Sequence, residues 1–260
     1  MHTADPLVSI VVPTYREVGN IPRLVPEVSH ALCSAGISFE TILVDDNSRD
    51  GSEEAVAGLR EQGYPVRMEI RTSERGLSSA VVRGFEQARG TYLVCMDADL
   101  SHPPSKIPEF IQLLESGEAD FVLGSRYVPG GSTDAEWGVF RWINSKTATL
   151  LARPLVTVRD PMSGFFALPR LLFERTAGLS PVGYKIALEL LVKTGARRAV
   201  EVPIRFADRT VGESKLNLRE QWSYLRHLKR LFDHRFGHGV PLRATIGRGH
   251  DEGACRPDLL

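Results

Sequence analysis

The sequence predicts an α/β domain in which a mostly parallel sheet is covered by helices on both faces. Short runs of β-branched and apolar residues alternate with amphipathic stretches through the first half of the chain, and such alternation is typical of parallel sheets. Some of these runs are almost continuously apolar, as in SIVVP and YLVCM, which fits strands buried on both faces. The size and composition, 260 residues with 42% hydrophobic and 25% charged, are ordinary for such a domain.

The elements of the first half follow from this alternation. Strands are predicted at residues 8–15, 39–46, 66–72, 91–99 and 120–128. Crossover helices are expected between them, at 20–35, 50–63, 76–90 and 104–117. Asn20 followed by Pro22 indicates a helix start. Helix ends favour a residue of positive φ, and we assign that role to Gly36, Gly63 and Gly90.

The second half departs from the simple repeat. A Gly-rich loop after Val128 leads to further elements, predicted as a helix at 137–153, a strand at 163–169, a helix at 183–195, a strand at 199–208 and a polar loop at 209–217. The domain limits that follow are an N-terminal tail at 1–6, one domain at 7–217, an amphipathic C-terminal helix at 218–235 and a disordered tail at 236–260.

Several classes of protein are disfavoured. The longest run without Asp, Glu, Lys or Arg, residues 28–39, is too short for a spanning helix, which needs about 20 residues. The N-terminus lacks a basic region ahead of its apolar stretch, so we expect no signal peptide. The three cysteines, Cys33, Cys95 and Cys255, are far apart and form no CxxC pair. This predicts neither a disulfide framework nor a structural zinc site, and favours the cytoplasm.

Charge is distributed unequally along the chain. Residues 1–130 carry 11 basic and 19 acidic side chains, and residues 131–260 carry 21 and 13, so the halves have net charges of −8 and +8. A basic half fits an acidic or membrane-surface partner. The alternative is charge scattered over solvated faces.

Acidic residues gather where the predicted parallel strands end, at the edge where ligands bind in such sheets. Asp45 and Asp46 end the second strand, and Asp97 and Asp99 end the fourth. Strand alternation would aim the last two carboxylates the same way, where they repel unless a cation lies between them. Oxygen ligands suit Mg²⁺ or Mn²⁺, and a metal there could neutralise a diphosphate leaving group. A dehydrogenase GxGxxG and a Walker GxxxxGK[ST] are both absent from the sequence.

These segments resemble a family 2 glycosyltransferase of the GT-A fold, a Rossmann-like α/β fold. The resemblance covers roughly residues 7–235 and is carried by VSIVVPTYREVGNI, ILVDDNSRDGS, GLSSAVVRGFEQARGTYLVCMDADLSHPP and GSRY. Within that family, the second half is similar to the polyprenol (dolichol) phosphate mannosyltransferases through GSRYVPGG, RWINSKTATLLA, DPMSGFFAL and EVPIRFADRTVGESKL.

The resemblance implies an inverting enzyme that transfers mannose from GDP-mannose to a polyprenyl (dolichyl) phosphate and gives a β-linked product. One alternative is a UDP-sugar-dependent enzyme, such as a glucosyltransferase, acting on the same acceptor. Another is a non-catalytic nucleotide- or lipid-binding module of the same fold. No nucleic-acid partner is expected.

The resemblance also implies site residues. The residues that it implies for donor binding are Pro13, Tyr15, Glu17, Asp45, Asp46, Asp97, Asp99, Arg209 and Lys215. The acceptor phosphate falls to Arg126, Arg141 and Ser145, with Arg209 also matching a family position for it. Asp97 and Asp99 are the expected ligands of Mg²⁺ or Mn²⁺, and Ser101 stands where the family often has a third ligand, Gln.

The catalytic set is Asp97, Asp99 and Arg126, without a general base, because a phosphate acceptor is already ionised. His102 is interpreted as part of a structural turn before two prolines rather than as an acid or base. For Asp45 and Asp46 the alternative role is to cap the helix at 50–63, with Asp50 as a competitor.

Two segments are candidates for contact with the membrane that a lipid acceptor requires. Residues 218–235 place apolar side chains at three- and four-residue steps, with basic residues nearby, which is typical of an interfacial helix. A helix packed on the domain gives the same pattern. The stretch 141–155 is the second candidate. We therefore expect a cytoplasmic enzyme that associates peripherally with the membrane, and an anchoring subunit is not readable from the sequence.

Overall fold

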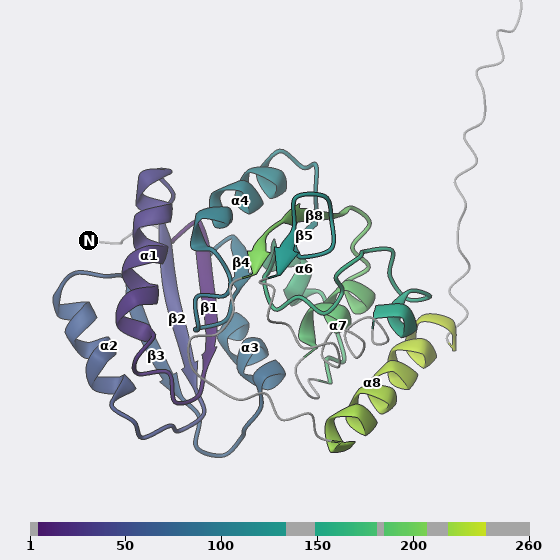
Figure 1. Cartoon of the computed structure of the whole chain (residues 1–260), viewed down its shortest axis with the longest axis horizontal. Helices are drawn as coiled ribbons and strands as arrows, with labels where there is room; N and C mark the ends of the chain where they lie inside the picture. The colour runs from purple at the N-terminus through teal and green to yellow at the C-terminus, as the bar shows by residue number, and fades with distance from the viewer. Residues whose placement is uncertain (1–4, 134–148, 181–184, 207–217, 238–260) are drawn as a thin grey trace, which may run out of the picture.

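The computed structural model describes residues 5–133, 149–180, 185–206 and 218–237. At its centre is a seven-stranded sheet with the order β3-β2-β1-β4-β7-β5-β8 (Figure 1). Its strands are β1 (Val8–Thr14), β2 (Phe39–Asp45), β3 (Val66–Ile70), β4 (Tyr92–Cys95), β5 (Phe121–Ser125), β7 (Phe166–Pro169) and β8 (Ala199–Pro203). The predicted α/β class is confirmed.

One strand of this sheet runs against the others. β7 is antiparallel to both of its neighbours, β4 and β5, whereas the other paired strands are parallel. The carboxyl ends of β1 to β5 and β8 therefore lie at the same edge of the sheet. A second, two-stranded parallel sheet joins β6 (Ser132–Thr133) to β9 (Arg205–Phe206), just beyond the ends of β5 and β8.

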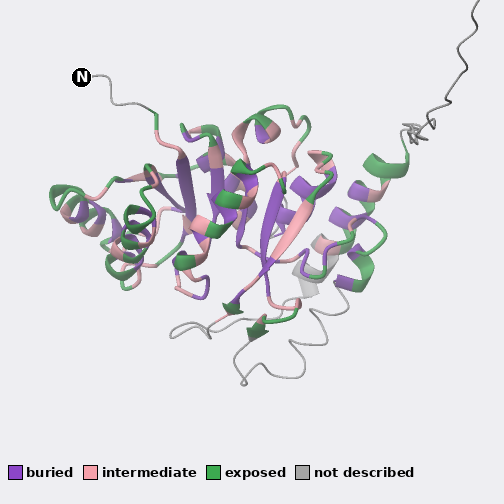
Figure 2. Ribbon diagram, turned by 90° about the horizontal axis from the view of Figure 1, so that it is seen from above, coloured by how far each residue is buried: buried purple, intermediate pink, exposed green. Residues whose placement is uncertain are grey.

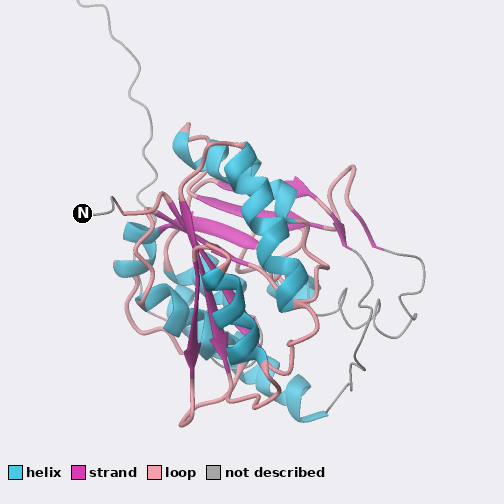
Figure 3. Ribbon diagram, turned by 90° about the vertical axis from the view of Figure 1, so that its left-hand side faces the viewer, coloured by secondary structure: helices cyan, strands magenta, loops and turns pink. Residues whose placement is uncertain are grey.

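Helices cover both faces of the sheet, as predicted (Figure 3). One face packs against α1 (Ile21–Ser34), α2 (Ser52–Glu61) and α4 (Ile107–Glu115), the last preceded by the short 3₁₀ turn Pro104–Lys106. The other face packs against α3 (Leu77–Glu86), α6 (Arg170–Glu174) and α7 (Ile186–Lys193).

Burial explains why the strands are so apolar. In β1, Ile10 and Val12 belong to one core and Val11 to the other, and all three are inaccessible to solvent. Figure 2 shows most of the strands as buried and places many exposed residues on the helices, whereas the outer strands β3 and β8 are mostly half-buried.

The predicted glycine roles are confirmed at two helix ends and wrong at the third. Gly36 and Gly63 adopt φ values of +68° and +90°. Gly90 has no positive φ, and α3 ends earlier, at Glu86. A Cβ atom on Gly90 would lie 2.5 Å from the backbone nitrogen of Ser9. A glycine at this position therefore lets the chain pass the start of β1, and does not end the helix.

The C-terminal helix α8 (Leu218–Phe236) packs at the end of the domain beside α7. Its Leu228 and Leu231 are buried in a third apolar cluster with Ala152, Leu155, Leu188 and Val192. The proposed tail, apart from residues 236 and 237, lies outside the described residues, as do residues 1–4, most of the helix predicted at 137–153 and the loop at 209–217. Among the described helices, none combines the length and apolar character needed to cross a membrane.

Candidate active site

The carboxyl edge of the sheet brings the two halves of the predicted site together. Asp45 ends β2, Asp97 follows β4 by two residues, and Arg126 directly follows β5. Four non-glycine residues with positive φ stand in the loops at this edge: Arg16, Asn47, Arg49 and Leu100. Backbone strain of this kind is concentrated at functional sites, where the surrounding structure must hold it. The edge that the sequence predicts as the ligand site is thus also where the backbone is most constrained.

Asp45 and Asp46, which are predicted to bind the donor, form hydrogen bonds that hold the neighbouring loops in place. Asp45 accepts hydrogen bonds from the backbone N–H and the hydroxyl of Ser48, at 2.7 and 2.5 Å. Asp46 pairs with the buried guanidinium of Arg71, whose Nε lies 2.8 Å away, and accepts the N–H of Gly76 at 2.8 Å. Both residues are buried, with the side chain of Asp46 13% exposed. Their visible role is therefore to hold the loops that follow β2 and β3 in place.

Neither of these carboxylates caps the next helix. Asp50 accepts the N–H and the hydroxyl of Ser52, at 3.1 and 2.7 Å, and also the N–H of Val18. Burial works against its ionisation, but these hydrogen bonds outweigh burial and lower the pKa of Asp50 below its ordinary value. The N-cap of α2 is Gly51, and Asp50 accepts the N–H of the first helical residue, Ser52, so that Asp45 and Asp46 hold loops and do not cap the helix.

Three further residues predicted for the donor lie on β1 and in the loop after it. Pro13 is half-buried within β1. Tyr15 is 46% exposed, and the guanidinium groups of Arg16 and Arg75 lie 5.3 and 5.8 Å from the centre of its ring. Glu17 accepts a hydrogen bond of 2.6 Å from Asn20. The exposed ring and its two cations form an entrance suited to an anionic, planar ligand.

Asp97 and Asp99 lie in the loop after β4 and not in the strand, because β4 ends at Cys95. Between them Ala98 is buried, whereas both acidic residues are half-buried. Asp99 accepts hydrogen bonds from the backbone N–H and the hydroxyl of Ser101. Ser101 therefore supports a predicted metal ligand directly, and its own oxygen lies beside the carboxylate.

His102 anchors the same loop. Its Nδ1 accepts the backbone N–H of Asp97 at 2.9 Å, and its ring stacks on Phe165 with the ring centres 5.2 Å apart. Burial lowers the pKa of His102 below its ordinary value, despite the nearby charges of Asp97 and Asp99. A neutral ring that accepts a backbone hydrogen bond is a structural element of the turn, in agreement with the interpretation made from the sequence.

Arg126, directly after β5, lies beside the cluster of Asp97, Asp99 and His102. Its guanidinium forms a double salt bridge with Asp160, with Nε and Nη2 each 2.8 Å from a carboxylate oxygen. Phe206 lies 5.5 Å from the ring of His102 and 5.3 Å from the guanidinium carbon of Arg126, measured from its ring centre. Burial alone would lower the pKa of Arg126, but the hydrogen bonds and charge of Asp160 and the charge of Asp97 raise it, so the group is permanently cationic.

Four of the predicted site residues cannot be placed. Arg141, Ser145, Arg209 and Lys215 lie outside the described residues. Among the residues that are described, the sequence interpretation missed Arg71, Asp160 and Glu201. Signals for Arg71 and Glu201 were present: Arg71 lies near the end of the strand predicted at 66–72, at the ligand edge, and Glu201 interrupts the apolar run AVEVPI. Asp160 is the first residue of the motif DPMSGFFAL, but its role depends on the fold bringing it to Arg126, which the motif alone does not reveal.

Gly164 lies against Asp97 and His102. A Cβ atom on Gly164 would lie 3.3 Å from Asp97 Oδ1 and 3.3 Å from His102 Cε1. The segment before β7 therefore forms a wall of the site, and only a glycine fits it without displacing Asp97.

We expect Gly164→Ala to slow the reaction predicted from the sequence roughly tenfold, because Asp97 must shift by a few tenths of an ångström, and a misplacement of about 1 Å at reacting groups can cost about 100-fold. His102 is held by Phe165 and Phe206, so the Asp97 carboxylate is the group that moves. Steady-state rates and a thermal melt measure this effect. Gly58→Ala in α2 is the matched control, because a Cβ there meets nothing within 4 Å. An unchanged rate in Gly164→Ala would contradict the prediction.

With this geometry in view, comparison with known proteins assigns the chain to a family. The model of the family "Glycosyl transferase family 2" matches residues 9–176, well over half of the chain. The chain belongs to this family. It is a glycosyltransferase, and the matched range includes both the acidic loop after β4 and Arg126.

Its curated relatives include three proteins named dolichol-phosphate mannosyltransferase. The glycosyltransferase is 48% identical to the one from Mycosarcoma maydis, over 90% of this chain and 82% of the relative. It is 46% identical to the one from Saccharomyces cerevisiae, over 88% of each. It is 42% identical to the one from Pyrococcus furiosus, over 86% of this chain and 63% of the relative.

Solved structures show the fold of this glycosyltransferase. It is similar to glucosyl-3-phosphoglycerate synthase from Mycobacterium tuberculosis, solved in complex with Mn²⁺, UDP and glucosyl-3-phosphoglycerate. The TM-score is 0.62 at 20% identity, over 90% of this chain and 81% of that one. A crystal structure of a mycobacterial protein matches with a TM-score of 0.65 at 21% identity, over 90% and 76% of the two chains. The predicted GT-A fold is confirmed.

Proposed function

We propose that this glycosyltransferase transfers mannose from GDP-mannose to a polyprenyl phosphate of the dolichyl type and forms a β-linked product. The observation that carries the proposal is the position of Arg126 beside the Asp97–Asp99 loop, at one edge of the sheet. Such an arrangement can hold two phosphate-bearing substrates next to each other. The three relatives named dolichol-phosphate mannosyltransferase support mannose as the sugar and a dolichyl phosphate as the acceptor.

The reaction is a displacement at the anomeric carbon of the sugar. An oxygen of the acceptor phosphate forms a bond to this carbon while the bond to the donor diphosphate breaks, and the diphosphate leaves with the electron pair. No proton has to be removed, because the attacking phosphate is ionised at neutral pH. The protein contributes alignment of the two substrates and stabilisation of charge. An α-linked donor gives a β-linked product, because the attack inverts the carbon.

We infer that a divalent cation, Mg²⁺ or Mn²⁺, binds at Asp97 and Asp99. The described residues contain no group of three His, Cys, Asp or Glu side chains that could hold a metal. Two carboxylates with a nearby hydroxyl nevertheless fit Mg²⁺, which is commonly bound by one or two carboxylates together with substrate phosphates and water. When bound, the ion would neutralise negative charge on the leaving diphosphate. The structural neighbour solved with Mn²⁺ and UDP supports this assignment.

We assign the donor nucleoside to the ends of β1 and β2, where Tyr15 and Glu17 follow β1 and the buried Asp45 and Asp46 stand at the end of β2. The acceptor phosphate falls to Arg126, together with Arg141, Ser145 and Arg209, whose positions lie outside the described residues. Arg209 and Lys215 are also proposed for the donor diphosphate.

The experiment that tests the proposed function compares donors. The full chain is incubated with labelled GDP-mannose or labelled UDP-glucose and a short polyprenyl phosphate, and the label is then extracted into organic solvent. Label from GDP-mannose alone supports the proposal. Label from UDP-glucose alone would favour the glucosyltransferase alternative, and none from either would favour the non-catalytic module.

We propose that this enzyme associates peripherally with the membrane on its cytoplasmic side, through α8 and residues 149–155. The structure divides the apolar residues of these segments into two sets. Leu228 and Leu231 are buried in the third cluster and serve as core. Four others are exposed, by 66% for Leu150, 41% for Leu151, 48% for Leu225 and 60% for Phe236. Exposed basic residues of α8, such as Arg226 and Arg230, would add attraction to anionic lipid.

We expect the double variant Leu150→Gln, Leu151→Gln to bind anionic vesicles at least tenfold more weakly with its circular dichroism unchanged. Burying one leucine contributes about 1.5–3 kcal/mol, enough for that difference. Leu171→Gln, a leucine 60% exposed on α6, is the matched control. By contrast, Leu231→Ala should destabilise the fold by about 2–5 kcal/mol, because its side chain is core. Equal vesicle binding by the double variant and the wild type would contradict the membrane assignment.

A further inference from the structure

The carboxylate of Asp160 holds Arg126 at three points. It accepts the backbone N–H of Arg126 at 3.1 Å, and Nε and Nη2 at 2.8 Å each. Asp160 is inaccessible to solvent, and the side chain of Arg126 is 10% exposed. A fork of two parallel hydrogen bonds fixes the plane of the guanidinium as well as its position. The direction in which its third nitrogen, Nη1, points is thereby fixed too.

Asp160 is itself held rigidly. Glu201 of β8 accepts the backbone N–H groups of Arg159 and Asp160, at 2.7 and 2.9 Å. The carbonyl of Asp160 accepts the N–H of Ser163 at 3.2 Å, and the hydroxyl of Ser163 donates to the carbonyl of Gly124 in β5 at 2.7 Å. The turn at 160–163 is thus fastened to both β5 and β8, the two strands that carry the arginine side of the site.

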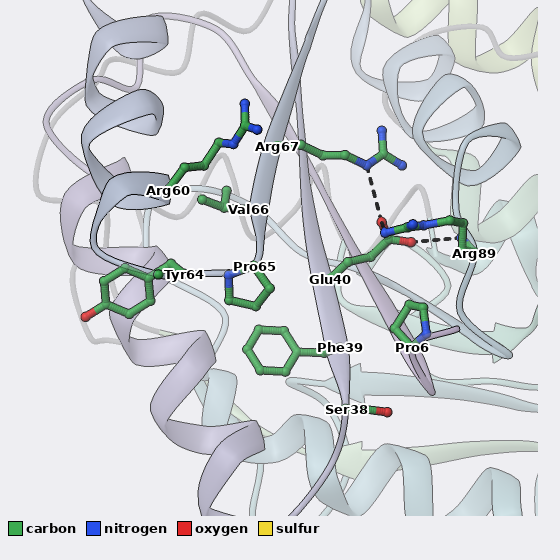
Figure 4. Close-up of a pocket in the computed structure, with 11 residues that line it drawn as sticks. Pro6, Ser38, Phe39, Glu40, Arg60, Tyr64, Pro65, Val66, Arg67 and Arg89 are labelled. Atoms are coloured by element: carbon green, nitrogen blue, oxygen red, sulfur yellow. Dashed lines mark hydrogen bonds and ion pairs between the residues drawn. The ribbon is translucent and has the colours of Figure 1, made fainter. Parts of the chain in front are cut away.

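We propose that Asp160 is a positioning residue that acts through Arg126, and that its function is to present the guanidinium to the acceptor phosphate in one orientation. This inference rests on the proposed role of Arg126 in acceptor binding. The alternative is that the pair only stabilises the fold, as the buried carboxylate Glu40 does at the opposite edge of the sheet. There, in a pocket of about 460 Å³, Glu40 pairs with Arg67 and Arg89, far along the strands from the site (Figure 4).

The two roles predict different kinetics. An arginine already held in its binding orientation loses little conformational freedom when phosphate binds, and it therefore binds phosphate more tightly. This advantage disappears when the carboxylate that holds the arginine is removed. Asp160→Asn keeps the shape of the side chain but removes its charge. We expect it to raise the acceptor KM about 10- to 100-fold, the range seen when a partner that orients a binding group is lost. The donor KM should stay within about twofold of the wild type.

The test is a double-mutant cycle on the full chain with GDP-mannose and a short polyprenyl phosphate. Its members are the wild type, Asp160→Asn, Arg126→Ala and the double variant, each measured for the KM of both substrates, kcat and thermal unfolding. If Asp160 acts through Arg126, adding Asp160→Asn to Arg126→Ala changes the acceptor KM less than twofold. Glu40→Gln is the matched control: it weakens a buried ion-pair network and should lower the unfolding temperature without changing either KM.

The outcomes separate this inference from the proposed function. If Arg126→Ala raises the acceptor KM and Asp160→Asn does not, the positioning role is wrong and the proposed function stands. Additive effects of the two substitutions also overturn the positioning role. If Arg126→Ala leaves the acceptor KM unchanged, the proposed acceptor site fails and this inference fails with it. Should Asp160→Asn not fold, Glu201→Gln, which loosens the same turn from behind, takes its place with the same expected direction.

Discussion

Asp97→Ala and Asp99→Asn should each reduce sugar transfer by at least about 1000-fold while leaving the chain folded. The leaving diphosphate needs several kcal/mol of charge stabilisation, and each 1.4 kcal/mol corresponds to about a factor of ten in rate. Removing the divalent ion with EDTA should have the same effect, and adding Mg²⁺ or Mn²⁺ should reverse it. Initial rates with labelled GDP-mannose measure the loss.

The choice of substitution at each position follows from the contacts. Asp99 accepts two hydrogen bonds from Ser101, so Asp99→Ala would also remove support from the turn, at about 1 kcal/mol per bond. Asp99→Asn keeps an acceptor there. Glu174→Gln, an exposed carboxylate on α6, is the control for loss of one negative charge. Full activity of both aspartate variants in metal-free buffer would contradict the metal assignment.

Arg126→Ala should weaken the acceptor far more than the donor, raising the acceptor KM about 10- to 100-fold. One charge-assisted hydrogen bond to a phosphate contributes roughly 1.5–3 kcal/mol, which corresponds to that range. Arg126→Lys should recover only part of the loss, because a lysine cannot make both bonds to Asp160. Arg141→Ala is expected to have the same selectivity.

The thermal stability of each variant must be measured together with its KM values for donor and acceptor. Removing the arginine leaves the buried Asp160 without its partner, which typically costs about 3–5 kcal/mol, so Arg126→Ala should also melt earlier. The ratio of the two KM values is the informative quantity, because partial unfolding lowers the active fraction without changing either KM. A donor KM that rises while the acceptor KM is unchanged would place Arg126 in the donor site instead.

The sheet and the general location of the site could be predicted because both depend on local patterns. Apolar runs such as SIVVP become central strands when helices cover both faces, and the ends of parallel strands must share an edge. The direction of β7 could not be predicted, because SGFFALP is apolar enough for either orientation. Its antiparallel pairing depends on which strands are already in place.

Individual side-chain roles were harder to predict, because they depend on contacts between distant segments. Asp46 is predicted to bind the donor, but in the fold its carboxylate pairs with Arg71, 25 residues away. Asp160 meets Arg126 across 34 residues. The apolar stripe of α8 fits a core helix and an interfacial helix equally well; Leu228 and Leu231 are core, whereas Leu225 is exposed, and its contact with a membrane stays a prediction.

The position of β7 between β4 and β5 has a consequence for biosynthesis. β4 leads to Asp97 and β5 leads to Arg126, but the two strands do not pair with each other; residues 166–169 join them. A nascent chain that has emerged only as far as residue 130 therefore carries both groups without the strand that aligns them. We therefore expect the predicted site to form only after β7 has left the ribosome, and Asp160 emerges just before it. A chain truncated before residue 160 should accordingly be inactive, even though it retains the acidic loop and the arginine.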